Sequence, residues 1–318
     1  MARILLVKTS SLGDVVHNLP VVNDIHAHVP GAKIDWVAEE PFASIPKLHP
    51  GVDAVIPVAI RRWRRALLSA QTRSEGKVFL QQLRQHSYDA VIDTQGLFKS
   101  ALVSCAARGI RHGLDWKSSR EPLRFFYDHT HAVPWGQHAV TRNRILAALA
   151  LGYEVTGPAD YGIKCQPQGF PWLPSGRYAV LLHATSAATK LWSESRWLEF
   201  HKYLFLNNIL SVLPWGNADE HRRSERLSAA MHGAIVPPSL PLQTMAALLA
   251  GAHAVVGVDT GLTHLAAALR VPTVGIYCAT NPAATGIHAG PHAVNLGGID
   301  APPSAQEAAA AVERLARN

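Results

Sequence analysis

Short apolar runs alternate with longer amphipathic segments along this chain, and the alternation is present in both halves. Eight of the runs have the length and β-branched content of strands, four in each half: 4–7, 34–37, Ala54–Val58, 90–92, Tyr178–Leu182, 209–213, Ala254–Val258 and Thr273–Tyr277. Strands separated by helical segments are typical of parallel sheets with helical crossovers. The pattern therefore predicts an α/β protein with two Rossmann-like domains in series.

A segment rich in proline and glycine, 157–176, lies between the two halves. Both residue types interrupt regular structure, so this segment predicts a linker. Near the end of the chain, an alanine-rich stretch begins at Ser304, and Glu307 follows at the spacing of a helix-capping box. We expect a first domain, a linker, a second domain and a terminal helix at 1–160, 161–176, 177–303 and 304–318.

Open parallel sheets bind ligands beyond the carboxyl ends of their strands, so polar residues at these positions are the first candidates for chemistry. In the first half, the first strand leads through Lys8 and Ser10 to Asp14, at the start of a predicted helix. Asp14 can cap this helix or act as a catalyst. Lys8 can hold an anion or remain solvated at the rim.

In the second half, the segment 256–264 predicts a strand and a glycine turn, and a helix follows at 265–269. The free N–H groups and the dipole at a helix N-terminus favour an anion such as a diphosphate, and Gly261 has no side chain to block it. The alternative is an ordinary turn in which Asp259 or Thr260 caps the helix.

Two further loops of the second half carry polar residues after a strand. Thr185, Ser186 and Lys190 supply hydroxyls and a cation that can neutralise a leaving diphosphate. Lys190 is also consistent with an exposed surface lysine. Glu220 can bind ribose hydroxyls or simply be solvated.

Charge and composition indicate the kind of partner, the degree of order and the location of the protein. The 318 residues carry a formal net charge of +7, which indicates an anionic partner, and four cations lie within 61–65. These arginines can clamp phosphates or carboxylates, or form a solvated helix start. The content of 48% hydrophobic and 17% charged residues argues against disorder. The first apolar run is too short for a signal peptide or a membrane span, so we expect the protein to stay inside the cell.

Missing motifs count against several classes of protein. The sequence has no G-x-G fingerprint and no P-loop, as a nicotinamide dehydrogenase or a Walker-type ATPase would have. It has no D-x-D or H-E-x-x-H motif, and its three cysteines are far apart, so we predict no metal site and no disulfide framework. Nucleic-acid binding is a rival function for a basic protein, but no aromatic-rich binding motif accompanies the cations.

Five motifs follow one another along the chain: VKTSSLGD at 7–14, IPVAIRRWR at 56–64, VIDTQGL at 91–97, LPWG at 213–216 and VDTGLTH at 258–264. Together they resemble the lipopolysaccharide heptosyltransferase family, glycosyltransferase family 9, and within it the type I enzymes. The resemblance implies a GT-B architecture, with two facing Rossmann-like domains and a C-terminal crossover helix. It also implies inverting, metal-independent transfer of L-glycero-D-manno-heptose from ADP-heptose to the inner Kdo of Kdo2-lipid A. The implied location is peripheral, on the anionic cytoplasmic face of the inner membrane.

The resemblance also implies roles for individual residues. The catalytic residues are Asp14, as general base, and Lys190. The donor-binding residues are Thr185, Ser186, Lys190, Glu220, Asp259, Thr260, Gly261 and His264. The acceptor-binding residues are Lys8, Ser10, Arg61, Arg62, Arg64 and Arg120. No metal or cofactor is implied, and the segment after Tyr277 matches too loosely to receive a role.

Two alternatives remain open at this point. One is a related heptosyltransferase that adds a later core heptose. The other is a protein that binds nucleotide sugars or nucleic acid without catalysis.

Overall fold

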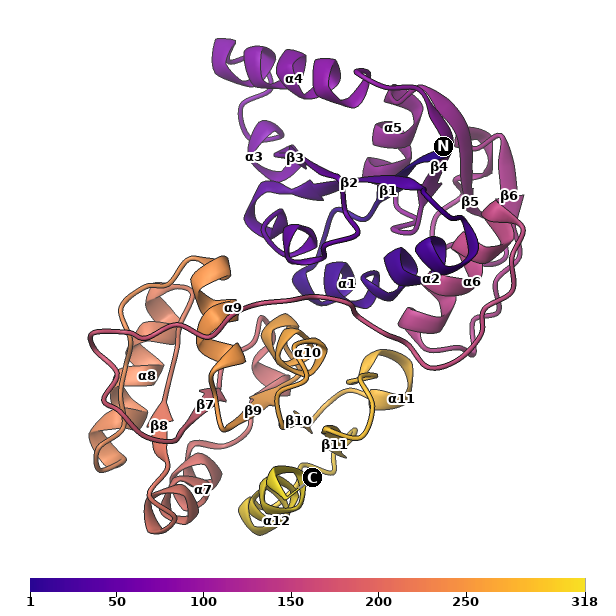
Figure 1. Cartoon of the computed structure of the whole chain (residues 1–318). Coiled ribbons are helices and arrows are strands. Elements are labelled where there is room, and N and C mark those ends of the chain that lie inside the picture. The colour runs from indigo at the N-terminus through magenta and orange to yellow at the C-terminus, as the bar shows by residue number, and fades with distance from the viewer. Residues whose placement is uncertain (318) are drawn as a thin grey trace. The chain divides into compact units, whose positions relative to one another are not determined.

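The computed structural model describes residues 1–317 and divides the chain into two compact domains (Figure 1). The first spans Met1–Ile163 and the second begins at Lys164. The division falls inside the segment 161–176 that the sequence predicts as a linker. Asn318, the last residue of the predicted terminal helix, lies outside the described residues.

The first domain is built on a six-stranded sheet whose strands are all parallel. The strands are β1 (Arg3–Val7), β2 (Lys33–Glu39), β3 (Ala54–Val58), β4 (Tyr88–Asp93), β5 (Gly109–Leu114) and β6 (His129–His131). Their spatial order is β3-β2-β1-β4-β5-β6, so the chain changes direction across the sheet between β1 and β4. Ligands of open α/β sheets bind at such a reversal, beyond the carboxyl ends of the strands.

Helices cover both faces of this sheet (Figure 1). On one face, α1 (Leu12–His17), α2 (Pro20–His28) and α6 (Ala139–Leu151) pack together. On the other face lie α4 (Ala70–Leu83) and α5 (Phe98–Ala106), whose apolar side chains join the sheet in one buried cluster. Short helical turns occupy the connections: η1 (Glu40–Phe42), η2 (Pro46–Leu48), α3 (Ile60–Trp63) and η3 (Arg124–Phe126).

The second domain contains a five-stranded parallel sheet. Its strands are β7 (Tyr178–Leu182), β8 (Leu210–Val212), β9 (Ala254–Val258), β10 (Thr273–Tyr277) and β11 (Ala293–Gly297), in the order β11-β10-β9-β7-β8. The helical elements are η4 (Ala188–Lys190), α7 (Glu194–Leu206), α8 (Ala218–Ala230), α9 (Leu242–Ala250), α10 (Gly261–Ala268), α11 (Pro282–Thr285) and α12 (Ala305–Ala316). The order reverses between β7 and β9, which makes their carboxyl ends the expected ligand position.

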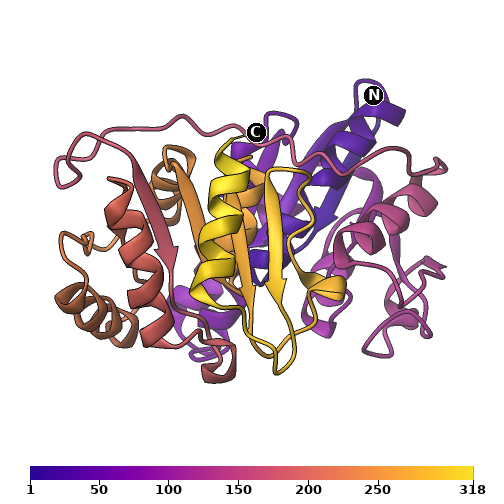
Figure 2. The same ribbon diagram turned by 90° about the horizontal axis from the view of Figure 1, so that it is seen from below.

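The terminal helix α12 belongs to the second domain, beside its strands (Figure 2). Its apolar stripe, which includes Ala308, Val312 and Leu315, is buried in the core of that domain. The predicted terminal helix is present, and its alanine-rich face packs closely on the sheet of this domain. The predicted capping box is confirmed, because Glu307 Oε2 accepts hydrogen bonds from Ser304 N at 2.7 Å and Ser304 Oγ at 2.8 Å.

All eight predicted strands are confirmed, and so is the class of two parallel-sheet α/β domains. The predicted helix 265–269 is present but begins earlier, at Gly261. The sequence analysis missed β5, β6 and β11, which lie at or next to sheet edges and are only partly buried. Within residues 1–317, no helix is long and apolar enough to cross a membrane.

Candidate active site

In the first domain, the carboxyl ends of β1 and β4 are joined where the strand order reverses. The side-chain oxygen of Gln95, after β4, accepts hydrogen bonds from the backbone N–H groups of Thr9 and Ser10 at 3.1 and 3.0 Å. Gly96 follows with a φ of +64°, a conformation that favours glycine, and the turn it forms is held by Asp93 Oδ1. The segment that leads to Asp14 therefore has a fixed start.

Lys8 lies behind this segment. Its side chain is buried, and Nζ donates to Thr94 O at 2.7 Å and to Asn143 Oδ1 at 3.4 Å. Burial lowers the pKa of the Lys8 ammonium, while the nearby carboxylates of Asp14 and Asp93 oppose the shift. Lys8 therefore supports the end of β1, and its predicted role in acceptor binding stays a prediction.

Asp14 is the third residue of α1, and one of its oxygens caps the helix. Oδ2 accepts hydrogen bonds from Ser11 N at 2.7 Å and from Ser11 Oγ at 2.8 Å. Within the described part of the chain, Oδ1 takes no hydrogen bond. Because each carboxylate oxygen can accept independently, capping through Oδ2 leaves Oδ1 able to accept a proton from a substrate hydroxyl.

Lys99, on α5, is a site residue that the sequence analysis missed. Its Nζ donates to Ser10 Oγ at 2.5 Å. Burial lowers the pKa of Lys99, the Arg61 and Arg64 charges lower it further, and Asp14 acts in the opposite direction. These couplings place Lys99 among the cations next to Asp14. The signal in the sequence was its position two residues beyond the VIDTQGL motif, at the end of the strand beside β1.

The arginines of the 61–65 cluster differ in their contacts. Arg61 and Arg64 are exposed, and in the described residues neither guanidinium forms an ion pair. Arg62 is bound on both sides, to Glu40 at 2.9 Å and to Glu75 at 2.8 Å. Both ion pairs lie within the domain, and the predicted role of Arg62 in acceptor binding stays a prediction.

Arg120 is exposed, and its charge lowers the pKa of the Lys8 ammonium, so it lies near the same edge of the sheet. The carboxyl edge at β1 and β4 therefore brings the carboxylate of Asp14 close to several cations: Lys99, Arg61, Arg64 and Arg120. Such a surface fits an acidic ligand that carries a nucleophilic hydroxyl.

In the second domain, Asp259 follows β9 directly and forms hydrogen bonds with residues that follow the neighbouring strands β7 and β10. Its Oδ2 accepts hydrogen bonds from Lys190 Nζ at 2.7 Å and from Thr280 Oγ1 at 2.9 Å. Its backbone oxygen accepts from Thr185 Oγ1 at 2.9 Å, and His264 Nε2 lies 3.8 Å from Oδ1. Thr280, after β10, is thus a second residue that the sequence analysis missed, in a segment that received no role.

The electrostatics of this cluster favour an ionised carboxylate. Burial raises the pKa of Asp259, but hydrogen bonds from His264 and Lys190 outweigh it and hold that pKa well below its usual range. The Lys190 side chain is 29% exposed. Its ammonium has three donors, so it can hold Asp259 and still donate to a ligand.

Helix α10 begins directly beside this cluster, and its position depends on a glycine in β9. A Cβ on Gly257 would come within 2.2 Å of Thr263 Oγ1, which itself donates to Val258 O at 2.8 Å. Glycine therefore lets the first turn of α10 pack against the strand. The N-cap residue Thr260 makes no side-chain cap bond. The free N–H groups of this turn are therefore available to an anion.

The remaining predicted donor residues lie on neighbouring loops. Ser186 is exposed next to Thr185. Glu220, in the first turn of α8, accepts from Gly216 N at 2.7 Å and Asn217 Nδ2 at 2.9 Å and so holds the loop after β8. The sheet order therefore brings together Thr185, Ser186, Lys190, Asp259, Thr260 and Thr280 at three adjacent strand ends, with Glu220 on the fourth.

No group of three or more His, Cys, Asp or Glu residues within 1–317 is arranged to hold a metal ion. Lys190 and the start of α10 supply positive charge at the carboxyl edge of the second sheet.

Sequence comparison gives a consistent result. The chain is 47% identical over 289 residues to lipopolysaccharide heptosyltransferase 1 of Escherichia coli K12, covering 89% of this chain and 90% of that protein. It is 48% identical to the Pseudomonas aeruginosa PAO1 protein of the same name, covering 93% and 83%. Identity to lipopolysaccharide heptosyltransferase 2 of E. coli K12 is 24%, covering 88% and 84%.

Solved structures agree with this result. The E. coli heptosyltransferase WaaC with ADP superposes with a TM-score of 0.90 at 41% identity, covering 98% of this chain and 99% of that one. The same enzyme with ADP-2-deoxy-2-fluoro heptose gives a TM-score of 0.84 at 42% identity, with 99% of both chains covered. The model of glycosyltransferase family 9 (heptosyltransferase) matches residues 77–313. The family match over most of the chain, the identities and the shared two-domain fold together show that this chain belongs to glycosyltransferase family 9, the heptosyltransferases.

Proposed function

We propose that this chain transfers L-glycero-D-manno-heptose from ADP-heptose to the inner Kdo of Kdo2-lipid A, with inversion at the anomeric carbon. The observation that carries the proposal is the contrast in identity: 47–48% to two heptosyltransferases 1 against 24% to a heptosyltransferase 2. The difference favours addition of the first core heptose over a later one.

The second domain supplies the donor site in this proposal. ADP-heptose binds at the carboxyl ends of β7, β9 and β10, with its diphosphate at the start of α10. Negative charge grows on the diphosphate as the bond to the anomeric carbon breaks. Lys190, Thr185 and the N–H groups after Thr260 are fixed in place before reaction, so they stabilise this charge without reorganisation.

The first domain supplies the acceptor site and the base. The carboxylates of the Kdo sugars bind Lys99, Arg61, Arg64 and Arg120, and Asp14 Oδ1 accepts the proton of the attacking hydroxyl. An aspartate is a weak base at neutral pH, but the hydroxyl becomes acidic as its bond to carbon forms. The same cations are suited to an anionic membrane surface, where we place the protein as a peripheral enzyme.

The test is a transfer assay with purified protein, ADP- and UDP-sugars, and either Kdo2-lipid A or the same lipid already carrying one heptose. Mass spectrometry of the lipid identifies donor, acceptor and product together. We expect one heptose to be added to Kdo2-lipid A from ADP-heptose. Addition only to the heptosylated lipid would indicate a later step, and donor binding without any product would indicate a non-catalytic protein.

Transfer is expected to persist in excess EDTA. Lys190 and the start of α10 can supply the positive charge that a divalent metal provides in other transferases. The initial rate of ADP release, measured before and after EDTA dialysis, checks this expectation. Loss of activity that Mg²⁺ or Mn²⁺ restores would show that a metal takes part.

Arg64→Gln is expected to raise the KM for the acceptor by about tenfold or more, because a charge-assisted contact to a carboxylate is lost. Arg62→Gln is the matched control. Its guanidinium is paired with Glu40 and Glu75, so we expect an acceptor KM within about twofold of wild type, as for other exposed ion pairs. Equal effects of the two substitutions, or an altered donor KM for Arg64→Gln, would refute the assignment.

A further inference from the structure

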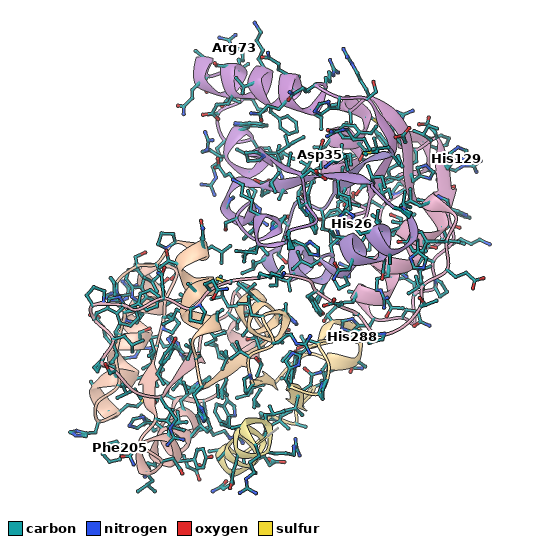
Figure 3. The ribbon with its side chains drawn as sticks, viewed as in Figure 1. His26, Asp35, Arg73, His129, Phe205 and His288 are labelled. Atoms are coloured by element: carbon teal, nitrogen blue, oxygen red, sulfur yellow. The ribbon has the colours of Figure 1, made fainter. Side chains whose placement is uncertain are left out.

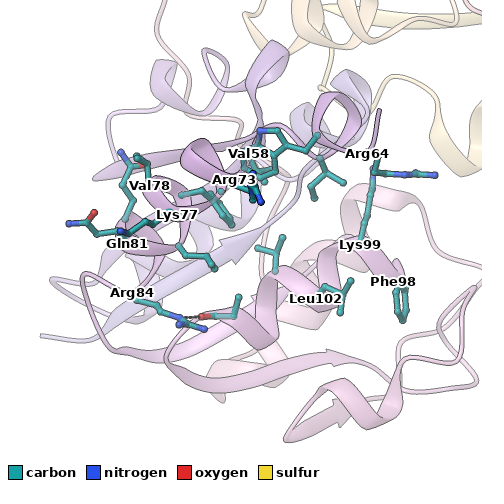
Figure 4. A pocket seen from close by; sticks show the side chains of 18 of the residues that line it. Val58, Arg64, Arg73, Lys77, Val78, Gln81, Arg84, Phe98, Lys99 and Leu102 are labelled. Atoms are coloured by element: carbon teal, nitrogen blue, oxygen red, sulfur yellow. Dashed lines mark hydrogen bonds between the residues drawn. The ribbon is translucent and has the colours of Figure 1, made fainter. Parts of the chain in front are cut away.

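A groove of about 2060 Å³ lies between α4 and α5 on one face of the first domain (Figure 4). The two helices pack over different strands, α4 over β3 and α5 over β4 and β1. The floor between them includes Val58, Phe79 and Val103, which are buried members of the domain core. The groove is therefore part of the folded domain.

The wall formed by α5 is apolar. Phe98, Leu102 and Ala106 recur every four residues and line the groove from one side of the helix. Phe98 is 53% exposed and Leu102 is 49% exposed. Large apolar side chains left exposed around a concavity are typical of a binding site for an apolar group.

The wall formed by α4 is cationic. Arg73 and Lys77 of α4 and Arg84, the residue that ends this helix, line the groove, and Arg73 is exposed (Figure 3). Arg84 donates to Ala106 O at 2.8 Å, whereas Arg73 and Lys77 form no ion pair in the described residues. Arg64, Lys99 and Arg108 add to the positive charge, and Glu121 is the acid that lines it.

The groove is continuous with the acceptor edge described above. Arg64 and Lys99 line the groove and also belong to the cations next to Asp14. Lys99 Nζ lies 2.5 Å from Ser10 Oγ, three residues from the end of β1. A ligand whose hydroxyl reaches Asp14 can therefore extend into the groove.

We propose that this groove binds the lipid end of the acceptor: an acyl chain against Phe98 and Leu102, and a phosphate on Arg73 and Lys77. The inference rests on the proposed function, because it assigns the other end of the same acceptor. A neutral lipid would leave the cations unpaired, and a polar polyanion would leave the apolar wall in water. A phosphorylated, acylated glycolipid pairs its phosphate with the cations and covers the apolar wall with its acyl chain.

Gly76→Trp tests the apolar part of the proposal. Gly76 lines the groove from within α4, and a Cβ there meets no atom within 4 Å. Replacing a glycine inside a helix does not weaken the helix, so the indole fills the groove without disturbing the fold. Ser74→Trp, at an exposed position of α4 that does not line the groove, is the matched control.

The readout is kcat/KM with two acceptors, Kdo2-lipid A and a Kdo oligosaccharide from which acyl chains and phosphates have been removed. For Gly76→Trp we expect a loss of about tenfold or more with the lipid, since several methylene groups return to water. We expect the value for the oligosaccharide to stay within about twofold of wild type, as for Ser74→Trp with both acceptors. Equal losses on both acceptors, or no loss on the lipid, would overturn the proposal.

Arg73→Gln combined with Lys77→Gln tests the phosphate contact. We expect a loss of about tenfold or more with Kdo2-lipid A and little loss with the dephosphorylated lipid. Lys47→Gln combined with Lys202→Gln removes two exposed charges elsewhere and is the control. The double substitution at Arg73 and Lys77 could instead weaken binding to anionic vesicles that lack the acceptor, while Gly76→Trp leaves kcat/KM unchanged. In that case the groove contacts the membrane surface and our assignment is wrong.

Direct binding separates this inference from the proposed function. The affinity for dihexanoyl phosphatidic acid, measured below its micellar concentration, should fall about tenfold in Gly76→Trp. If wild type transfers no heptose but this loss is seen, the function fails and the lipid groove stands. If wild type transfers heptose and neither the lipid affinity nor the acceptor preference changes, the groove assignment fails.

Discussion

Asp14→Asn is expected to lower kcat by about 10²–10⁴-fold, the usual contribution of a placed general base. The amide keeps the shape of the side chain, and its oxygen can still accept from Ser11 N and Ser11 Oγ as Oδ2 does. The helix cap is therefore retained, and the melting temperature and the affinity for ADP-heptose should change little. Single-turnover rates, donor affinity and thermal melting on this one variant separate catalysis from capping.

The second domain offers a matched control for this substitution. Glu307 Oε2 accepts from Ser304 N and Ser304 Oγ at the same two distances as Asp14 Oδ2 accepts from Ser11. Glu307→Gln should leave kcat unchanged, since the cap is alike and no chemistry is assigned there. If Asp14→Asn keeps activity within about threefold of wild type, which is ~0.65 kcal/mol in the barrier, Asp14 is only a cap.

The sequence was sufficient to predict the buried part of the fold. Central strands such as β1, β7 and β9 are continuous apolar runs because helices cover both faces of a parallel sheet. The strand β6 consists of His129, Thr130 and His131 and is half exposed, so it has no hydrophobic pattern to detect. Edge strands are defined by hydrogen bonds to a neighbour, which periodicity does not encode.

The sequence predicts site residues where a motif marks the end of a strand. It does not predict which charged side chains form ion pairs with one another. The sequence pointed to Asp14, Lys190 and Asp259, but it did not reveal that the last two form an ion pair. It also grouped Arg62 with Arg64, although only the structure shows Glu40 and Glu75 around Arg62. Partners distant in sequence determine which cations remain available to a ligand.

Lys190→Ala is expected to lower kcat by about 10²–10³-fold, the cost of removing one donor from a developing anion. The effect on ADP affinity should be smaller, because the charge on the leaving diphosphate peaks in the transition state. Single-turnover rates with saturating acceptor and the Kd of ADP measure the two effects. Equal losses in rate and in ADP affinity would indicate simple binding.

A substitution of Asp259, the ion-pair partner of Lys190, provides the control for Lys190→Ala. Lys190→Ala leaves a largely buried carboxylate without its lysine partner, so a lower melting temperature is expected as well. Asp259→Asn in the same chain removes the unpaired charge and should restore much of the melting temperature. If Lys190 acts on the leaving group, the double variant regains much of the melting temperature but remains about as slow as Lys190→Ala. If Lys190 only neutralises Asp259, the second substitution recovers the rate as well, and a catalytic role for the lysine is excluded.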